Sequence, residues 1–495
     1  MGTIESLENS LLKYIYLKTI YAQNARLFYS ILLHNIFRLY PIIYEPNLDE
    51  LCLNFNLVYG TTYGMFINYD THKGAVGECL DNWPVEPQVI SMSDGSNVGT
   101  KGDVGMGSMA FTDTRRSFYV LGGFQPNQTL PIALDVGCDD EEILFSNHYL
   151  GLKCKRVDEE LHEALMDEFM RECKTPWPSA LIELVGFKPN LTLKYLEKYK
   201  DDYCVLVEDI QAVFITLMAT LYNGMRSQEL PVKDIKIVIY GGGYRAAGIA
   251  SFIIKFLKSE GLDGEVAHER IYLVDDAGLV TSNRGALYGH QRTFARKDHT
   301  KALTLKALIA TVHPYALLCL GDGEMPPIDK GTVVALRKYC PSGCPIIGTM
   351  SHPSPETELS FANAVKWTDG NLLFASTRIL PRVRHKKLLY GSAHLNTFLV
   401  TPGIALGVAM SGCQKVTDKM MTTIARYVAS CCNPKDVMVH KKLLLPMEMM
   451  QEMAKRLACF VWNVAKKEKI AAREPPKDAT ELRRMVEDAI YSLKY

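Results

Sequence analysis

The spacing of apolar residues changes several times along this 495-residue chain. At 11–40 apolar and aromatic residues recur every three or four positions, which predicts a pair of amphipathic helices that stops at Pro41. Helical spacing returns at 157–222. In between, at 63–135, short apolar runs bounded by Gly and Asp predict strands of a mixed sheet, namely GMFINY, PQVISMS, SFYVLGG and LPIALDV.

Strand-like and helix-like segments alternate in the second half of the chain. An apolar run at 235–240 precedes a glycine cluster, a helix-like run through Lys258 and a second apolar run at 271–274, which together predict a βαβ unit. Further strand-like runs continue this alternation at 316–320, 345–350 and 371–376. The pattern is typical of an α/β fold with a doubly wound parallel sheet.

Composition and charge exclude several classes of protein. Hydrophobic residues make up 47% and charged residues 22% of the chain, which is typical of a globular protein. Lys and Arg together number 55, as do Asp and Glu, so the net charge is zero and favours neither nucleic acid nor a membrane surface as a partner. The 13 cysteines, mostly in apolar runs, are typical of reduced thiols and predict a cytoplasmic location.

The clearest local motif is GGGYRAAG at 241–248, which follows a predicted strand and opens a predicted helix. Gly241, Gly243 and Gly248 would allow a tight turn, and the helix N-terminus would offer N–H groups to a pyrophosphate. Asp275 ends the next strand, where a ribose-binding carboxylate belongs, although it lies further along than the usual ~20 residues. The motif predicts a dinucleotide site; the alternative is a Gly-rich turn in an unrelated α/β domain.

Ordered blocks along nearly the whole chain resemble the malic enzymes. The resemblance spans about 12–476 and rests on YIYL, PIIYEP, SDGSNVGTKGDVG, LPIALDVG, YLGLKCKRV, LEKYKDDYCVLVEDIQ, the glycine motif, LVDDAGLV, SHPSPETE and PGIALGV. It implies a multi-domain fold with a Rossmann-type NAD(P)-binding domain. The implied reaction is the oxidative decarboxylation of malate to pyruvate, with NAD or NADP and a divalent metal such as Mg²⁺ or Mn²⁺.

The resemblance also implies a division of the chain. Its parts are a helical N-terminal domain at 1–62, an α/β domain at 63–207 and 397–466, a Rossmann-type domain at 208–396 and a C-terminal extension at 467–495. Within the extension, a short helix is predicted at 478–493 with Asp478 as its N-cap. The segment that precedes YIYL in typical members is missing, so we expect the family's usual oligomer contacts to be altered.

Several positions that carry the family's chemistry differ in this chain. The resemblance assigns the acid to Tyr44, which is retained, and the lysine base to the position of Arg115. An arginine stays protonated in proteins and cannot serve as that base. The arginine that clamps the substrate carboxylate aligns with Asn97, which removes a bidentate charged contact. Lys101 is a candidate substitute for it.

The implied metal site has lost most of its ligands. Val185 and Gly186 replace two acids, and Asp209 is the only ligand position that survives. Mg²⁺ and Mn²⁺ prefer several hard oxygen ligands, so we expect the metal to be lost. Glu183 would point to a different side from position 185 on a helix and is not expected to substitute. Glu208 is either a second acid or a surface salt-bridge residue.

Two further positions align with substrate-facing asparagines of the family, namely His352 and Asn396. A histidine at a strand end is either part of a hydrogen-bonded framework or a group of the site. On the cofactor side, Asp275 is followed by Asp276, and a second acid would repel a 2′-phosphate, which favours NAD over NADP.

These substitutions favour a malic-enzyme-like pseudoenzyme that has lost its metal site and base and has a structural or interaction role, with NAD or NADP as a cofactor it could still hold. One alternative is an active malic enzyme or another NAD(P)-dependent hydroxy-acid oxidoreductase with an altered site. Another is a silent subunit in a hetero-oligomer with an active paralogue. The expected partners are therefore a second copy or such a paralogue.

Overall fold

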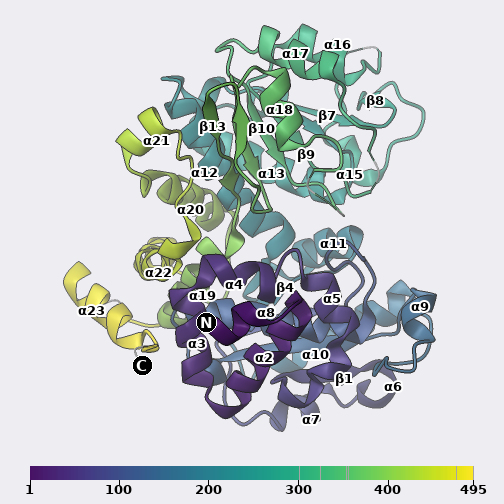
Figure 1. The fold of residues 1–495 in the computed structure, drawn as a ribbon, viewed down its shortest axis with the longest axis vertical. Coiled ribbons are helices and arrows are strands. Elements are labelled where there is room, and N and C mark those ends of the chain that lie inside the picture. Colours follow the sequence, from purple (N-terminus) through teal and green to yellow (C-terminus); the bar gives the residue numbers. More distant parts are fainter. Residues whose placement is uncertain (300, 324, 353, 355, 475, 494–495) are drawn as a thin grey trace. The chain divides into compact units, whose positions relative to one another are not determined.

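The computed structural model describes residues 1–493 apart from 300, 324, 353, 355 and 475, and the chain divides into two compact units (Figure 1). The first unit consists of Met1–Asp209, Phe398–Thr417 and Pro446–Tyr495. The second consists of Ile210–Thr397 and Asp418–Leu445. Each unit therefore joins segments that are far apart in the sequence. The finer division that the resemblance implies stays a prediction.

Short helices open the first unit. They are α1 (Gly2–Ser6), α2 (Ser10–Gln23), α3 (Ala25–His34), α4 (Ile36–Ile43) and α5 (Leu48–Leu53). Asn9 and Asn24 begin α2 and α3 by accepting the backbone N–H three residues on. The expected stop at Pro41 is wrong, because Pro41 lies inside α4. Its missing N–H leaves only the carbonyl of Phe37, an exposed residue, without a helical partner.

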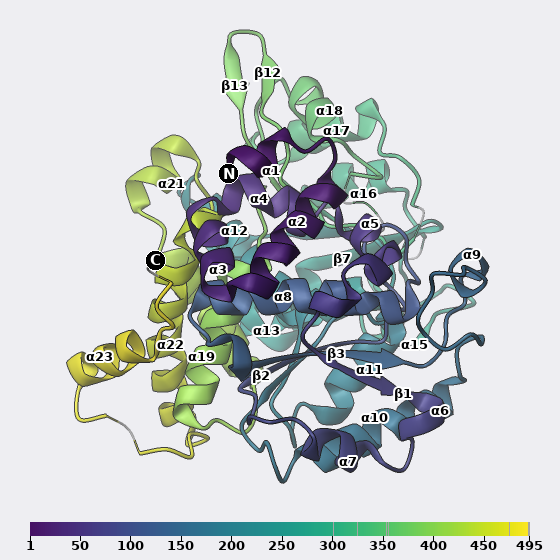
Figure 2. The ribbon, with the colours of Figure 1, turned by 60° about the horizontal axis from the view of Figure 1, so that its bottom comes forward.

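A parallel sheet forms the core of the first unit, in the order β1-β3-β2-β4-β5 among the described strands. These strands are β1 (Met65–Asn68), β2 (Val89–Ser93), β3 (Thr129–Asp135), β4 (Leu181–Leu184) and β5 (Val205–Val207). Helix α8 (Ser108–Gly122) packs along β2 and β3 (Figure 2). The runs GMFINY, PQVISMS and LPIALDV thus coincide with β1, β2 and β3. SFYVLGG does not form a strand; it ends α8, and the prediction failed because a short apolar run by itself does not distinguish a strand from a buried helical turn.

Strands interrupt the region 157–222 that was expected to be helical. The order there is α10 (Glu159–Cys173), β4, α11 (Pro189–Tyr199), β5, a π-helical turn η5 (Glu208–Ala212) and α12 (Val213–Arg226). Residue 183 therefore lies on strand β4 and not on a helix. Residues two apart on a strand face the same side. The argument that Glu183 points away from the side of position 185 assumed a helix and therefore does not hold.

The second unit contains a larger sheet, in the order β14-β11-β10-β9-β6-β7-β8 among the described strands, parallel except at β7–β8. The predicted βαβ unit is confirmed as β6 (Ile237–Tyr240), α13 (Tyr244–Ser259) and β7 (Ile271–Asp275). The other strands are β8 (Gly278–Leu279), β9 (Ala316–Cys319), β10 (Ile346–Thr349), β11 (Leu373–Ser376) and β14 (Ala393–His394). The three later predicted strands are thus confirmed as β9, β10 and β11.

Helices cover this sheet, and a hairpin extends from it. They include α12, α14 (Gly264–Glu269), α15 (Gly289–Arg292), α16 (Leu305–Val312), α17 (Lys330–Tyr339) and α18 (Phe361–Trp367). Two further helices of this unit, α20 (Asp418–Ser430) and α21 (Pro434–His440), pack on α12. The hairpin pairs β12 (Val383–His385) with β13 (Leu388–Tyr390). In the described part of the chain, no helix is both long enough and apolar enough to span a membrane.

Two late helices of the first unit pack unusually closely. A Cβ added to Gly407 of α19 (Thr401–Ser411) would lie 2.6 Å from Cβ of Val461 on α22 (Met450–Glu468). A Cβ on Gly403 would lie 2.9 Å from Cα of Ala454. Further on, Asp478 accepts N–H bonds at the start of α23 (Ala479–Ala489), which confirms the predicted cap.

We predict that Gly407→Leu lowers the free energy of unfolding of the first unit by about 2 kcal/mol or more, because the added atoms have no space between α19 and α22. Thermal and denaturant unfolding followed by circular dichroism measures the change. Gly60→Leu is the matched control, since no neighbouring heavy atom lies within 4 Å of its added Cβ. Equal stability of the two variants would contradict the close packing.

Candidate functional site

The buried side chain of Arg115 on α8 forms an ion-pair cluster inside the first unit. Its Nε and Nη2 donate to Oε2 and Oε1 of Glu183 on β4, at 2.9 and 2.5 Å. Ser91 also donates to Oε2 of Glu183, at 2.7 Å. Nη1 of Arg115 lies 3.6 Å from Oε1 of Glu208 at the start of η5. We call Arg115, Glu183 and Glu208 the Arg115 cluster.

The electrostatics of the Arg115 cluster keep the guanidinium charged. Burial disfavours the charged form and by itself lowers the pKa of Arg115, but the carboxylates of Glu183 and Glu208 outweigh burial and raise it well above its ordinary value. The guanidinium carbon also lies 4.7 Å from the centre of the Phe398 ring, a favourable cation–π contact. The residue at the predicted base position is thus a permanent cation that cannot accept a proton.

Tyr44, the retained acid position, lies beside this cluster at the end of α4. Its ring packs against Phe118 and Phe398, with centroids 5.8 and 5.1 Å away. Burial raises the pKa of Tyr44 well above its ordinary value, although the nearby charge of Arg115 acts in the opposite direction. The phenol therefore stays protonated at neutral pH, which is the state that a proton donor needs.

The positions assigned to the metal ligands are packed with apolar atoms. Val185 is buried, and Gly186 has φ +67°, a backbone conformation that disfavours an aspartate. A Cβ on Gly186 would lie 2.9 Å from both Ser93 Oγ and Val98 Cγ2. Asp209 is the remaining carboxylate of the implied set and lies in η5.

Two other acids near this place bind Arg115 instead of being arranged around a metal. Glu183 was not expected to face the site, but on β4 it does, and its carboxylate is engaged by Arg115. Glu208 forms an ion pair, as one of its two predicted alternatives states, but it is buried and not at the surface, and its partner is Arg115. Among the residues that the structure describes, no group of three His, Cys, Asp or Glu side chains is arranged to hold a metal ion.

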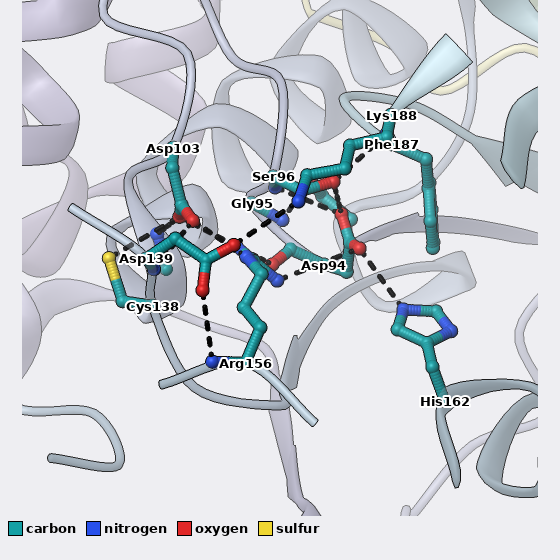
Figure 3. Close-up of polar contacts among 12 residues, drawn as sticks. Asp94, Gly95, Ser96, Asp103, Cys138, Asp139, Arg156, His162, Phe187 and Lys188 are labelled. Carbon is teal, nitrogen blue, oxygen red and sulfur yellow. Dashed lines mark hydrogen bonds and ion pairs between the residues drawn. The ribbon is translucent and has the colours of Figure 1, made fainter. Parts of the chain in front are cut away.

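A buried polar network holds the loop that carries Asn97 (Figure 3). Arg156 donates through Nε and Nη2 to Asp103, both at 2.7 Å, and Nε2 of His162 lies 3.0 Å from Oδ2 of Asp94. The backbone N–H of Asn97 donates to the Gly186 carbonyl at 2.9 Å. These contacts hold the loop between β2 and α8 close to the end of β4, the strand that carries Glu183 of the Arg115 cluster.

Lys101, the candidate substitute for the clamp, points to another part of the first unit. Its Nζ lies 2.8 Å from Oδ2 of Asp140 and 3.3 Å from Oε2 of Glu142, at the start of α9 (Glu141–Leu144). The charge of Lys101 is thus engaged by two carboxylates outside the Arg115 cluster.

The glycine motif of the second unit forms the predicted turn between β6 and α13, and neighbouring protein atoms lie close to its glycines. A Cβ on Gly241 would lie 2.4 Å from the Leu320 carbonyl oxygen, and one on Gly243 would lie 2.1 Å from Oδ2 of Asp322. Gly248 packs against Ile210 in the same way. The glycines therefore allow close packing within the protein.

The other predicted residues of the second unit are also engaged. Asp275 ends β7 as expected and accepts from Nη1 of Arg284 at 2.9 Å. His352 follows β10, and its backbone N–H donates to the Gly321 carbonyl at 2.8 Å. Asn396 is buried just after β14. The sequence analysis did not identify Asp322 or Arg284 as residues that contact this turn and Asp275. The only signal was for Asp322, an acid that follows the predicted strand at 316–320.

Comparison with known proteins agrees with this architecture. Residues 21–200 match the profile described as "Malic enzyme, N-terminal domain", and residues 210–466 match "Malic enzyme, NAD binding domain". The NAD-dependent malic enzyme of Proteus mirabilis is 30% identical over 429 residues, 85% of this chain and 75% of that protein. The NADP-dependent malic enzyme of Dictyostelium discoideum is 28% identical over 480 residues, 96% and 87% of the two chains.

Solved structures show the same fold at low sequence identity. The malic enzyme of Entamoeba histolytica aligns with a TM-score of 0.60 and 17% identity over 92% of this chain and 80% of its own. That of Pyrococcus horikoshii Ot3 aligns with a TM-score of 0.59 and 15% identity over 90% and 87%. The architecture is therefore that of the malic enzymes, with a Rossmann-type sheet. The chain belongs to the malic enzyme family.

We predict that Arg115→Leu destabilises the first unit by about 3–5 kcal/mol, because it leaves the Glu183 charge buried without a partner. Adding Glu183→Leu should recover part of this loss, since the buried Glu183 charge is then gone, while Glu208 still lacks its partner. Urea unfolding of the two variants measures the difference. Arg483→Leu, which breaks an exposed pair with Glu487, is the control and should change stability by less than about 1 kcal/mol. A single variant as stable as the wild type would contradict the buried pair.

We also predict a loss of stability in acid from the network around Asp94. Burial alone would raise the pKa of Asp94, but Arg156, His162 and Ser96 outweigh it and lower the pKa to about 2. Because the folded-state pKa lies below the unfolded value, this stabilisation of about 2 kcal/mol is present above pH ~4 and is lost between pH ~4 and ~2. Asp94→Asn should remove this part of the pH dependence in unfolding measured from pH 6 to 2. An unchanged pH profile in that variant would contradict the assignment.

Proposed function

We propose that this chain is a non-catalytic member of the malic enzyme family with a structural or interaction role. The observation that supports this proposal is the buried bidentate pair between Arg115 and Glu183. It puts a permanent cation at the position assigned to the general base and engages an acid next to the implied metal ligands. The loss of the divalent metal is part of the proposal.

The size of the expected loss of activity follows from the chemistry. The polarising effect of a metal ion contributes several kcal/mol to such reactions, and each ~1.4 kcal/mol is a factor of ten in rate. Asn97 adds the loss of a bidentate carboxylate contact. The retained, protonated Tyr44 could donate a proton but has no base to act with.

The interaction role that we propose is assembly with a second copy or with an active relative of the same family, in the cytoplasm. The retained fold of both units supports this, because the surfaces through which a family assembles belong to its fold. Of the two dinucleotides, Asp275 and Asp276 favour NAD over NADP.

A second candidate is an active malic enzyme or another NAD(P)-dependent hydroxy-acid oxidoreductase with an altered site. The comparisons favour this candidate, because relatives that cover most of the chain are named as NAD- or NADP-dependent malic enzymes. The retained Tyr44 agrees with it.

Turnover separates the two candidates. We expect no malate-dependent reduction of NAD or NADP above a protein-free blank when the full chain is supplied with Mn²⁺, measured by nicotinamide absorbance. A malic enzyme in the same buffer is the positive control. Malate-dependent reduction that Tyr44→Phe lowers at least tenfold would contradict the proposal and establish the second candidate.

A further inference from the structure

An acidic side chain occupies the N-terminus of the helix that follows the glycine turn in the second unit. The backbone N–H of Arg245, in the first turn of α13, donates to Oδ2 of Asp322 at 3.1 Å. Asp322 comes from the loop after β9, and the cap residue Gly243 makes no side-chain cap of its own. The carboxylate of Asp322 therefore serves as the N-terminal anion of α13.

The Asp322 carboxylate is nearly buried and faces positively charged groups, although burial outweighs them and raises its pKa above its ordinary value. Its side chain is only 12% exposed, and Oδ1 lies 4.0 Å from Nε of Arg245. Neither Oδ1 of Asp322 nor Nε of Arg245 has a hydrogen-bond partner among the described atoms. The positive end of the α13 dipole and the guanidinium of Arg245 thus face one carboxylate.

The same place is where a Rossmann-type domain holds the pyrophosphate of a dinucleotide, on the N–H groups that open the first helix. A Cβ on Gly243 would meet Oδ2 of Asp322 at 2.1 Å, so the open space that the glycine would provide for a ligand is filled. A pyrophosphate there would have to displace Asp322 or lie against its charge. The residues present do not fit the dinucleotide in this arrangement.

Neighbouring side chains close the rest of the turn. His290 and Gln291 contact the carbonyl oxygen of Gly242, at 2.9 and 3.0 Å. The ring of His290 also packs against Tyr244, with centroids 3.9 Å apart. On the ribose side, Asp275 is engaged by Arg284. These contacts hold the turn and its surroundings in a packed state.

We propose that Asp322 is a built-in substitute for the dinucleotide phosphate, which blocks NAD and NADP from the turn between β6 and α13. This inference goes beyond the proposed function and does not depend on it, because it concerns binding and not turnover. The wild-type chain binds NAD and NADP weakly, and removal of the Asp322 carboxylate restores affinity.

The test compares NADH and NADPH binding to the full-length wild-type chain and to Asp322→Ala and Asp322→Asn, by nicotinamide fluorescence and calorimetry. We expect Asp322→Ala to bind NADH with a Kd at least tenfold lower than that of the wild type. Asp322→Asn keeps the size of the side chain and removes its charge, so its Kd should fall in between. NADH should bind more tightly than NADPH to both variants because of Asp275 and Asp276.

Asp234→Asn is the matched control, since this exposed carboxylate lies before β6, at the opposite end of the strand from the glycine turn, and should leave the Kd unchanged. Circular dichroism of each variant verifies that it is folded. If Asp322→Ala does not fold, the comparison with the wild type is made with Asp322→Asn. A wild-type Kd equal to that of the Asp322 variants would overturn the proposal. Failure of both folded variants to bind would overturn it as well, because the block would then not depend on Asp322.

Discussion

The ion pair between Arg115 and Glu183 is the interaction on which the central region of the first unit depends. Two charges without access to water are tolerated only if they engage one another. Here both oxygens of the Glu183 carboxylate accept from the Arg115 guanidinium and Oε2 also accepts from Ser91, while Nη1 of Arg115 has no hydrogen-bond partner among the described atoms. This requirement ties α8 to β4, and through Glu208 it extends to η5. The three elements are those that carry the positions assigned to the base and the metal ligands.

The same reasoning explains why the neighbouring substitutions agree with one another. A guanidinium beside a divalent cation would be repelled, so an arginine at position 115 is compatible with a site in which Val185 and Gly186 supply no charge. Glu183 and Glu208 then both face the single arginine. The cluster holds an internal cation, Arg115, at the position that the family resemblance assigns to a lysine.

A comparable exchange is found in the second unit, where the Asp322 carboxylate meets the N-terminus of α13. The Asp322 carboxylate has the sign of charge of a dinucleotide phosphate, whereas Arg115 in the first unit is a cation at a position assigned to a lysine. In each place one charged group of the protein faces another.

The sequence by itself determined the family, the α/β class, the glycine turn between β6 and α13, and the absence of a lysine at position 115. These depend on local patterns and on residue identity, which are visible in one dimension. Only the tertiary structure decided that SFYVLGG ends a buried helix and that Glu183 lies on a strand, because an apolar run has no period that distinguishes the two. The partners of Arg115 and the place of Asp322 were also decided there, since both contacts join residues more than 60 positions apart.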